Sequence, residues 1–214
     1  MKIVKWLAIG VGALIVLFLI IGMMLPGQVH VERSIAMKAP AARIFPLVNS
    51  FDHFKEWSPW AMRDPNTKYQ FNGPKEGVGC EMVWTSDNSE VGNGSQKIIE
   101  STPPTHVKTS LDFGMNGAAF ATFDLTEQGD STKVVWGLDS EMSGPVARWF
   151  GLAMDGMIGP DYEQGLASLK KLAESLPAEE AVADAGDTGD GDAADAGAGP
   201  AGDAPAQDAA DATP

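Results

Sequence analysis

The sequence has little of what disulfide-bonded or metal-binding proteins require. Its 214 residues include one cysteine, Cys80, and three histidines, His30, His53 and His106. A lone cysteine excludes an intramolecular disulfide and is typical of a small buried residue. The histidines fall on a predicted strand, a short helix and a loop, without the spacing of metal ligands. The sequence therefore predicts no metal site and no cofactor.

An excess of basic residues is also absent. The chain has 15 Lys and Arg residues against 29 Asp and Glu, a formal net charge of −14. A nucleic-acid-binding domain would carry a basic face, so we expect no nucleic-acid partner. Much of the charge is local, because residues 177–214 contain eight Asp and two Glu without Lys or Arg. This Ala/Gly/Asp/Pro tail cannot bury enough apolar surface to fold and is predicted to be disordered, either as a soluble extension or as an acidic lure for a basic partner.

The usual motifs of catalytic sites are missing. The sequence contains no Gly-x-Ser-x-Gly and no His-Glu-x-x-His, and its glycine-rich stretches at 77–79 and 92–94 lack the Gly-Lys-Ser/Thr of a phosphate loop. Asp155, Glu81 and His53 remain as weak catalytic candidates, because a buried carboxylate with a raised pKa can serve as an acid or a base. The pattern favours a solvated Glu81 and an Asp155 used for capping or hydrogen bonding.

The sequence does have a long apolar run near its N-terminus. Residues 6–25 carry no charge and no amide, and at about 1.5 Å per residue they can cross the roughly 30 Å core of a bilayer. The alternative is a cleaved signal peptide, which has an apolar core of about 7–15 residues and a small-x-small cleavage site. This run is longer and no Ala-x-Ala follows it, so we predict an uncleaved transmembrane anchor over residues 1–27.

Charges on the two sides of this run predict its orientation. Lys2 and Lys5 lie close to its N-terminal side, whereas Arg33, Lys38 and Arg43 lie further from its other end. Lys and Arg near a membrane span favour the cytoplasmic side. We therefore predict a cytoplasmic N-terminus, with the rest of the chain on the far side of the membrane.

Residues 28–176 have the size and pattern of one folded domain. Alternating apolar residues predict a first strand over 28–36, and Pro40 opens a predicted short helix that ends at Val48. A second helical turn is predicted over 51–57. Six further strands, separated by Gly, Pro, Asn and Asp turns, are predicted at 68–72, 80–86, 95–101, 107–113, 118–127 and 132–141. Strands joined by such short connections pair antiparallel.

A helical stripe of apolar residues closes the domain. It starts after Ser143-Gly144-Pro145 and continues to Leu176. Gly159-Pro160 interrupts the stripe, so we expect a kink there, or a short helix followed by a longer one. The predicted order is one strand, two short helices, six strands and a long helix, which is an α+β arrangement.

Several local motifs lie within this pattern. They are Val31-Glu32-Arg33-Ser34-Ile35 before Ala39-Pro40, Trp57-Ser58-Pro59-Trp60, Gly77-Val78-Gly79 before the strand ending in Trp84, Met154-Asp155-x-Met157-Ile158-Gly159-Pro160-Asp161, and Gly165-Leu166-x-x-Leu169-Lys170. Over about residues 29–176, the chain resembles the START and polyketide-cyclase-like superfamily, also called SRPBCC, and in particular its membrane-anchored bacterial polyketide cyclase or dehydrase members. The resemblance implies a helix-grip fold, with a curved antiparallel sheet of about seven strands around a long C-terminal helix. It also implies a bacterial inner-membrane protein, whose domain we then expect in the periplasm.

A helix-grip fold encloses a cavity, which aromatic, aliphatic and Met side chains would suit. The residues predicted to bind a ligand there are Trp57, Trp60, Met82, Trp84, Trp136, Phe150, Met154, Met157 and Ile158. The alternative is that each of these side chains is an ordinary core residue, which is what aromatic and Met stripes at helical spacing usually are. The segment 57–60 is predicted to be a loop, which serves either as a lid or interfacial anchor at the cavity mouth or as a structural plug.

Three functions are consistent with these patterns. The leading hypothesis is a membrane-tethered module that binds a hydrophobic small molecule or lipid, because tethering raises the effective concentration of a lipidic ligand. The second is an enzyme of the polyketide cyclase or dehydrase type that acts on an apolar substrate. The third is an interaction protein whose cavity is filled by its own side chains.

Overall fold

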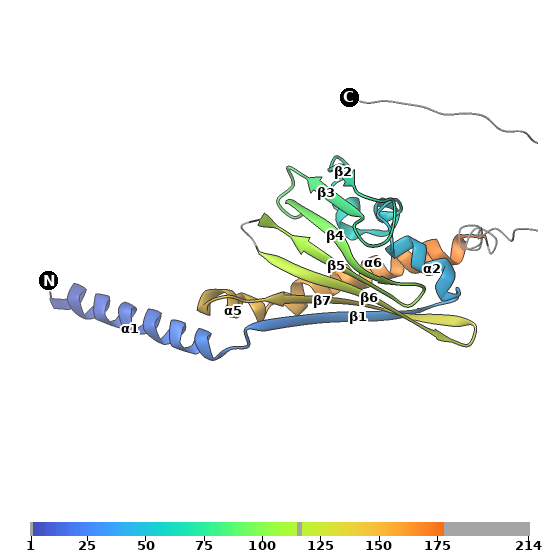
Figure 1. The fold of residues 1–214 in the computed structure, drawn as a ribbon. Coiled ribbons are helices and arrows are strands. Elements are labelled where there is room, and N and C mark those ends of the chain that lie inside the picture. The colour runs from blue at the N-terminus through green and yellow to red at the C-terminus, as the bar shows by residue number, and fades with distance from the viewer. Residues whose placement is uncertain (1, 115–116, 178–214) are drawn as a thin grey trace, which may run out of the picture. The chain divides into compact units, whose positions relative to one another are not determined.

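The computed structural model describes residues 2–114 and 117–177, and these residues form six helices and seven strands (Figure 1). The helices are α1 (Lys2–Met24), α2 (Ala41–Val48), α3 (Phe54–Trp57), α4 (Pro59–Arg63), α5 (Pro145–Gly151) and α6 (Met154–Ser175). The strands are β1 (Gln28–Met37), β2 (Lys68–Asn72), β3 (Glu81–Thr85), β4 (Asn93–Thr102), β5 (His106–Asp112), β6 (Ala118–Gln128) and β7 (Ser131–Glu141). The predicted strands are confirmed, with small differences at their ends.

The strands form one antiparallel sheet in the order β1-β7-β6-β5-β4-β3-β2. Strands β2 to β7 pair in sequence order, because connections this short cannot support a parallel crossover. β1 pairs instead with the last strand, where Val31 lies opposite Leu138. This pairing brings the end of α1 close to the start of α5, since the Met142 N–H donates to Gly27 O at 2.8 Å.

The sheet curves around α6, as the helix-grip fold requires (Figure 1). A register shift in β4 between Ile98 and Glu100 marks a bulge, which bends a strand and increases its twist. Burial follows the period of two expected for strands, so that Val134, Trp136 and Leu138 of β7 are all buried. The α+β fold predicted from the sequence is confirmed.

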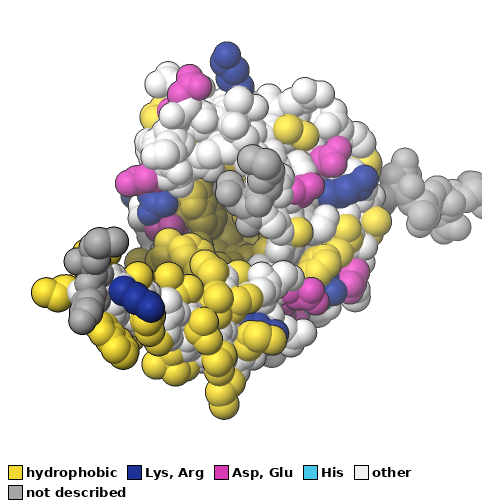
Figure 2. Space-filling view, turned by 90° about the vertical axis from the view of Figure 1, so that its left-hand side faces the viewer, with side chains coloured by type: hydrophobic (Ala, Val, Ile, Leu, Met, Phe, Trp, Pro, Cys, Tyr) yellow, Lys and Arg dark blue, Asp and Glu magenta, His cyan; other side chains and the backbone are white. Residues whose placement is uncertain are grey.

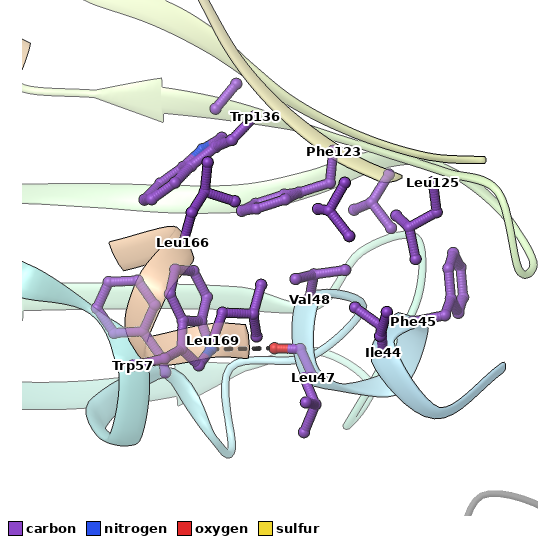
Figure 3. Packing of buried hydrophobic residues seen from close by; sticks show 14 of the residues in the cluster. Ile44, Phe45, Leu47, Val48, Trp57, Phe123, Leu125, Trp136, Leu166 and Leu169 are labelled. Carbon is purple, nitrogen blue, oxygen red and sulfur yellow. Dashed lines mark hydrogen bonds between the residues drawn. The ribbon is translucent and has the colours of Figure 1, made fainter. Parts of the chain in front are cut away.

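The hydrophobic core lies between the sheet, α2 and α6 (Figure 3). Leu166 and Leu169 of α6 are almost fully buried, and such a side chain stabilises the fold by about 1.5–3 kcal/mol. Trp57 Nε1 donates to Leu47 O at 3.2 Å, which joins α3 to α2. The predicted apolar face of α2 is buried in this core: Ile44, Phe45, Leu47 and Val48.

The C-terminal helical segment breaks at a different place from the one predicted. The sequence predicts an interruption at Gly159-Pro160, but the structure places it at Leu152 and Ala153, between α5 and α6. Pro160 lies inside α6 and lacks one N–H. Gly156, whose carbonyl would have accepted that hydrogen bond, is exposed to solvent, so the helix tolerates the proline.

The N-terminal helix α1 contains the apolar run. Its segment Ile3–Met24 is long and apolar enough to cross a membrane, and by length and composition it fits an anchor or a signal sequence. At the other end of the chain, the tail predicted to be disordered lies from residue 178 onward outside the described residues.

Candidate ligand-binding cavity

A cavity lies between the curved sheet and the helices α3, α4 and α6. The cavity has a volume of about 100 Å³ and is open to solvent on one side. None of the described residues in its wall is Asp, Glu, His, Lys or Arg. The wall consists of aromatic residues, aliphatic residues and one amide: Phe54, Trp57, Trp60, Tyr69, Trp84, Val91, Gln96, Leu111, Phe113, Ala121, Trp136, Leu138, Ile158 and Tyr162.

Trp136 of β7 is the centre of the aromatic wall. Its ring stacks on Tyr162 of α6 with centroids 3.8 Å apart, and the Trp57 ring meets it edge-on at 5.5 Å. Helix α6 can come this close because Gly165 has no side chain: a Cβ there would lie 2.7 Å from Trp136 Cζ3. Gly165 therefore determines how closely α6 approaches the sheet beside the cavity.

Trp60 contributes to the same cluster from α4. Its ring meets those of Trp136 and Tyr162 edge-on, at 6.0 and 6.3 Å. The sequence predicts a loop at 57–60, but α3 ends at Trp57 and α4 begins at Pro59. A proline in the first turn of a helix costs no hydrogen bond, which is why this short helix forms. Both tryptophans thus belong to helices in the cavity wall.

An ion pair connects α4 to α6. Arg63 Nη1 donates to Asp161 Oδ2 at 3.0 Å, and Nη2 contacts the second carboxylate oxygen. Two parallel hydrogen bonds between a guanidinium and a carboxylate fix their geometry as well as adding energy. The hydrogen bonds to Asp161 raise the pKa of Arg63, which stays charged. Trp60, on the same short helix, is held in the wall by this pair.

The wall residues carry few polar atoms. Gln96 Nε2 donates to Thr109 Oγ1 at 2.9 Å. Trp136 Nε1 is buried and has no acceptor among the described residues. Burial raises the pKa of the Tyr69 and Tyr162 phenols, so both stay neutral at physiological pH. The wall can offer a ligand apolar surface and hydrogen bonds, but no formal charge.

Eight wall residues are partly exposed, and we take three of them, Trp84, Phe113 and Ile158, as the mouth of the cavity; Trp57 and Trp136 are buried. The rings of Trp84 and Phe113 meet edge-on at 5.9 Å. Figure 2 shows an apolar hollow beside α1, on the side of the molecule that bears the N-terminal end of Figure 1. The cavity therefore opens on the side of the sheet from which α1 extends.

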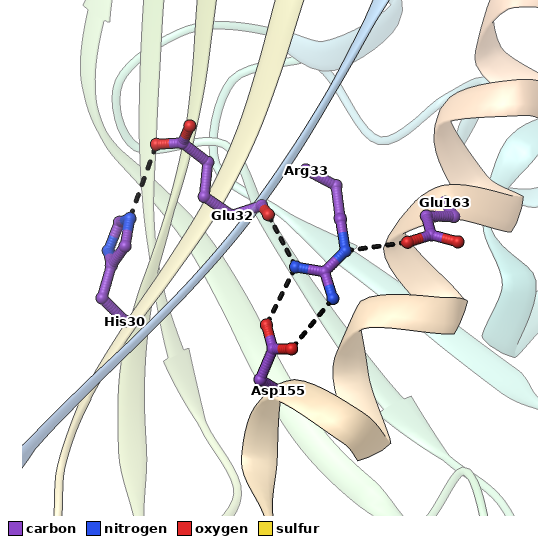
Figure 4. Close-up of polar contacts among 5 residues, drawn as sticks. All are labelled: His30, Glu32, Arg33, Asp155 and Glu163. Carbon is purple, nitrogen blue, oxygen red and sulfur yellow. Dashed lines mark hydrogen bonds and ion pairs between the residues drawn. The ribbon is translucent and has the colours of Figure 1, made fainter.

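The start of α6, next to this mouth, is held by Arg33 of β1 (Figure 4). Arg33 Nη1 and Nη2 donate to the Asp155 carboxylate at 2.8 and 3.1 Å, and Nε donates to Glu163 Oε1 at 2.9 Å. A Cβ at Gly159 would overlap the guanidinium, so this glycine makes room for it. The hydrogen bonds from Arg33 lower the pKa of Asp155, which is therefore ionised at neutral pH.

Of the nine predicted ligand-binding residues, four lie outside the cavity wall and five lie in it. Met82 is buried in the core, and Met154 packs against the core from α6. Phe150 and Met157 are exposed and do not belong to the cavity wall. The structure places the other five in the wall, where their contact with a ligand stays a prediction: Trp57, Trp60, Trp84, Trp136 and Ile158.

The three acid–base candidates lie outside the cavity wall. Asp155 pairs with an arginine, as described above. Glu81 accepts a hydrogen bond from Asn72 Nδ2 at 3.2 Å. His53 Nδ1 lies 2.7 Å from Glu56 Oε1 in an exposed contact. Apart from tyrosine hydroxyls, the described wall residues present no titratable group to a ligand.

Sequence reasoning missed several wall residues, above all Tyr69, Phe113 and Tyr162. Tyr162 lies on the predicted apolar stripe of the final helix, so its inward direction was visible in the sequence. The stacking of Tyr162 on Trp136 could not be predicted from the sequence, because it depends on how closely α6 approaches the sheet at Gly165. Phe113 ends a predicted strand, and its position at the mouth depends on the curvature of the whole sheet.

A curved antiparallel sheet around a long helix, with an apolar cavity between them, defines a helix-grip protein. The family model described as polyketide cyclase / dehydrase and lipid transport matches residues 28–174, so the chain belongs to that family. A search of the curated proteins found no match.

Solved structures with the same fold differ widely in sequence. Truncated norcoclaurine synthase from Thalictrum flavum is 16% identical with a TM-score of 0.56, over 70% of this chain and 96% of that one. The di-domain ARO/CYC protein BexL from the BE-7585A biosynthetic pathway is 14% identical with a TM-score of 0.52, over 71% of this chain and 52% of its own. A protein from Nitrosospira multiformis is 19% identical with a TM-score of 0.51, over 68% and 97%. At these identities the likeness shows the fold alone.

Proposed function

We propose that this chain is a membrane-anchored binding module, which holds a hydrophobic small molecule or a lipid in the cavity between the sheet and α6. The composition of the cavity wall carries the proposal: eight of its fourteen residues are aromatic, and none has a charged side chain. A charged ligand would lose its hydration there without gaining an ionic partner. An apolar ligand would gain about 25 cal/mol for each Å² that it removes from water.

The apolar helix α1 supports the membrane part of the proposal. A domain tethered beside a bilayer meets lipidic molecules at a raised effective concentration. The anchor stays uncleaved, with Lys2 and Lys5 on the cytoplasmic side and the cavity domain in the periplasm of a bacterium. A membrane and a lipidic ligand are then the two partners of the chain.

A cyclase-type enzyme acting on an apolar substrate is the second candidate, favoured by the family description and by the names of two structures with this fold. Asp155, Glu81 and His53 lie outside the cavity wall, so the chemistry would fall to the hydroxyls of Tyr69 and Tyr162. Burial raises the pKa of both, which disfavours their use as bases. The free volume of about 100 Å³ shows that the described side chains do not fill the cavity completely, which favours a ligand-binding module over a filled scaffold. Binding is therefore the function that the geometry supports best.

Photolabelling of the 214-residue chain in proteoliposomes tests the binding function. A fatty acid with a diazirine in its acyl chain serves as the apolar probe, and labelled peptides are mapped by mass spectrometry. We expect label on α1, which faces lipid, and also on wall residues of β4 and β5 such as Gln96 and Leu111.

Two alanines of β6 provide the matched variants. Ala121 lines the cavity, so Ala121→Phe fills it, whereas Ala118 is exposed and Ala118→Phe is the control. We expect Ala121→Phe to lose the β4 and β5 labels and to keep those on α1, while Ala118→Phe keeps both. Labelling confined to α1, or β4 and β5 labels that survive Ala121→Phe, would refute the binding function.

A further inference from the structure

Helix α5 exposes apolar side chains that the cavity does not use. Val146 and Phe150 are 62% and 53% exposed, and their spacing of four residues puts them on one helix face. Leu152 after α5 and Met157 in the first turn of α6 are 59% and 52% exposed. Single exposed apolar residues are common on soluble proteins. Four within twelve residues, on two consecutive helices and the link between them, indicate an interaction surface.

Another side of α5 packs against the last two turns of α1. The Trp149 ring stacks on Phe18 with centroids 5.0 Å apart and planes 8° apart, and its Nε1 donates to Phe18 O at 3.0 Å. Arg148 Nη1 donates to the carbonyl oxygens of Met23 and Leu25 at 2.5 and 3.1 Å. The carbonyls at the end of a helix lack partners within it, so Arg148 caps α1. These contacts join α5 to the end of the candidate membrane span.

The same contacts set the depth of α5 relative to α1. Phe18 precedes Met24, the last residue of α1, by six residues, which is about 9 Å along the helix axis. Amphipathic helices in a membrane interface bury their apolar face by about 5–10 Å. With Met24 at the membrane boundary, α5 therefore lies at interfacial depth. Trp149 is of the residue type enriched at that level, and Arg148 extends back toward the water as long basic side chains do.

We propose that α5 and the first turn of α6 form a second membrane contact, through Val146, Phe150, Leu152 and Met157, in the interface of the bilayer that α1 spans. This inference rests on the proposed function, because it takes α1 as an uncleaved anchor. A second copy of the chain is the rival occupant of the patch. Continuity with α1 favours the bilayer, since a helix packed against the end of a membrane span has lipid around its remaining sides.

The position of the cavity mouth gives this contact a role. Ile158, a wall residue at the mouth, directly follows Met157 of the patch. The hollow in Figure 2 opens beside α1 and the apolar residues around it. With the patch in the interface, the mouth faces the same bilayer. A lipidic ligand then passes between bilayer and cavity over apolar surface, without crossing bulk water.

The test measures lipid contact in the 214-residue chain, reconstituted in phosphatidylcholine vesicles. Cys80→Ser removes the native thiol, so that one introduced cysteine can carry the fluorophore NBD. Phe150→Cys reports on α5 and Leu14→Cys on α1. The control is Phe71→Cys. Phe71 is 51% exposed, a fraction similar to the 53% of Phe150, and it lies on β2, at the sheet edge opposite β1. Phosphatidylcholine with a nitroxide near the headgroup, or deep in the acyl chain, serves as the quencher.

We expect NBD at position 150 to emit at the short wavelengths of an apolar environment and to lose most of its fluorescence to the headgroup nitroxide. The label at position 14 is quenched best by the deep nitroxide, and the label at position 71 by neither. Quenching at 14 without quenching at 150 overturns this inference and leaves the anchor intact. Quenching at neither position overturns the anchor as well. A short-wavelength label at 150 that neither nitroxide quenches reveals a protein neighbour, and also overturns the inference.

Discussion

Arg33 and Arg63 both direct their guanidinium groups to carboxylates of α6, Asp155 and Asp161. The Arg33–Asp155 pair is exposed, and such pairs add little to stability, whereas Asp161 is buried. The effect of the two pairs is positional, because Arg33 ties β1 to the start of α6 and Arg63 ties α4 to the turn that follows. These two arginine pairs thus hold helices next to the cavity, and none of the described wall residues is charged.

The Arg33–Asp155 pair makes a prediction about pH. The pKa of folded Asp155 lies below its ordinary value of 3.8, because Arg33 donates hydrogen bonds to the charged form. The stabilisation is therefore fully present above about pH 4 and is lost as the pH falls through the lowered pKa. We expect Asp155→Asn to lower the unfolding temperature slightly at pH 7, and the difference from wild type to shrink below pH 4. Thermal unfolding followed by circular dichroism at several pH values measures this difference in unfolding temperature.

The control for this prediction is Asp130→Asn, in the exposed turn between β6 and β7. It should leave the unfolding temperature close to that of wild type across the same pH range. Equal differences between Asp155→Asn and wild type at pH 3 and pH 7 would contradict the assigned role of the pair.

Cys80 makes a second prediction at this scale. Its side chain is buried, and its thiol donates to Lys75 O at 3.2 Å. Burial raises the pKa of this thiol, and the thiolate is the reactive form. We expect iodoacetamide at pH 8 to leave folded wild-type protein unmodified and to alkylate it fully in denaturant, as measured by intact mass. The exposed Phe71→Cys in a Cys80→Ser background should react without denaturant; rapid alkylation of native Cys80 would show that the site is open.

At the scale of elements, the approach of α6 to the sheet depends on Gly165. A Cβ there would lie 2.7 Å from Trp136 Cζ3 and 3.1 Å from Pro59 Cδ. Alanine is favoured over glycine in a helix by about 1 kcal/mol, whereas overpacking costs about 1–3 kcal/mol. The contact with Trp136 is therefore the larger effect, and it decides the sign of a Gly165→Ala substitution.

We expect Gly165→Ala to destabilise the protein by up to about 2 kcal/mol, the difference between these two effects. Gly156→Ala is the matched control, because Gly156 lies in the same helix and a Cβ there has no neighbour within 4 Å. It should stabilise the protein by up to about 1 kcal/mol. Chemical unfolding of both variants measures the two free energies. A stabilising Gly165→Ala would mean that α6 does not rest on Trp136 as described.

The strands could be predicted because their signals are local. Alternating side chains and turn residues placed a strand at 68–72, which is β2, and another at 118–127, which is β6 without its last residue. The break in the C-terminal helix has a long-range component. Proline chemistry pointed to Gly159-Pro160, but α5 separates from α6 at Leu152 and Ala153. There α5 packs on α1, whereas α6 packs on the sheet. These two packing partners are distant in the sequence, so no local pattern indicates the break.

The cavity wall could be predicted only in part for the same reason. Helical periodicity shows which residues share an apolar stripe, and that stripe includes Ile158, Phe150 and Met157. It does not show what covers the stripe. Ile158 lines the cavity, whereas Phe150 and Met157 are exposed. The predicted tryptophans lie in the wall because Trp84 and Trp136 belong to strands of the sheet, whereas Trp57 and Trp60 belong to the short helices that border the cavity.

At the scale of the whole molecule, we infer a membrane anchor and a cavity whose mouth lies on the anchor side. The orientation predicted from Lys2 and Lys5 places the domain outside the cytoplasm. After expression in a bacterium, protease added to spheroplasts should degrade the domain, whereas intact cells and a cytoplasmic marker protein stay protected. Lys2→Glu with Lys5→Glu should weaken this orientation and leave part of the domain protected. Complete protection of the wild-type domain in spheroplasts would contradict the orientation.

Native mass spectrometry of the 214-residue chain, released from membranes without added lipid, tests whether the cavity holds an apolar molecule. The wild type and the exposed Ala118→Phe variant should each carry one apolar molecule per chain that the cavity-filling Ala121→Phe variant lacks. A wild-type chain that stays ligand-free even after incubation with a lipid extract, or an equal bound mass on Ala121→Phe, would contradict the account.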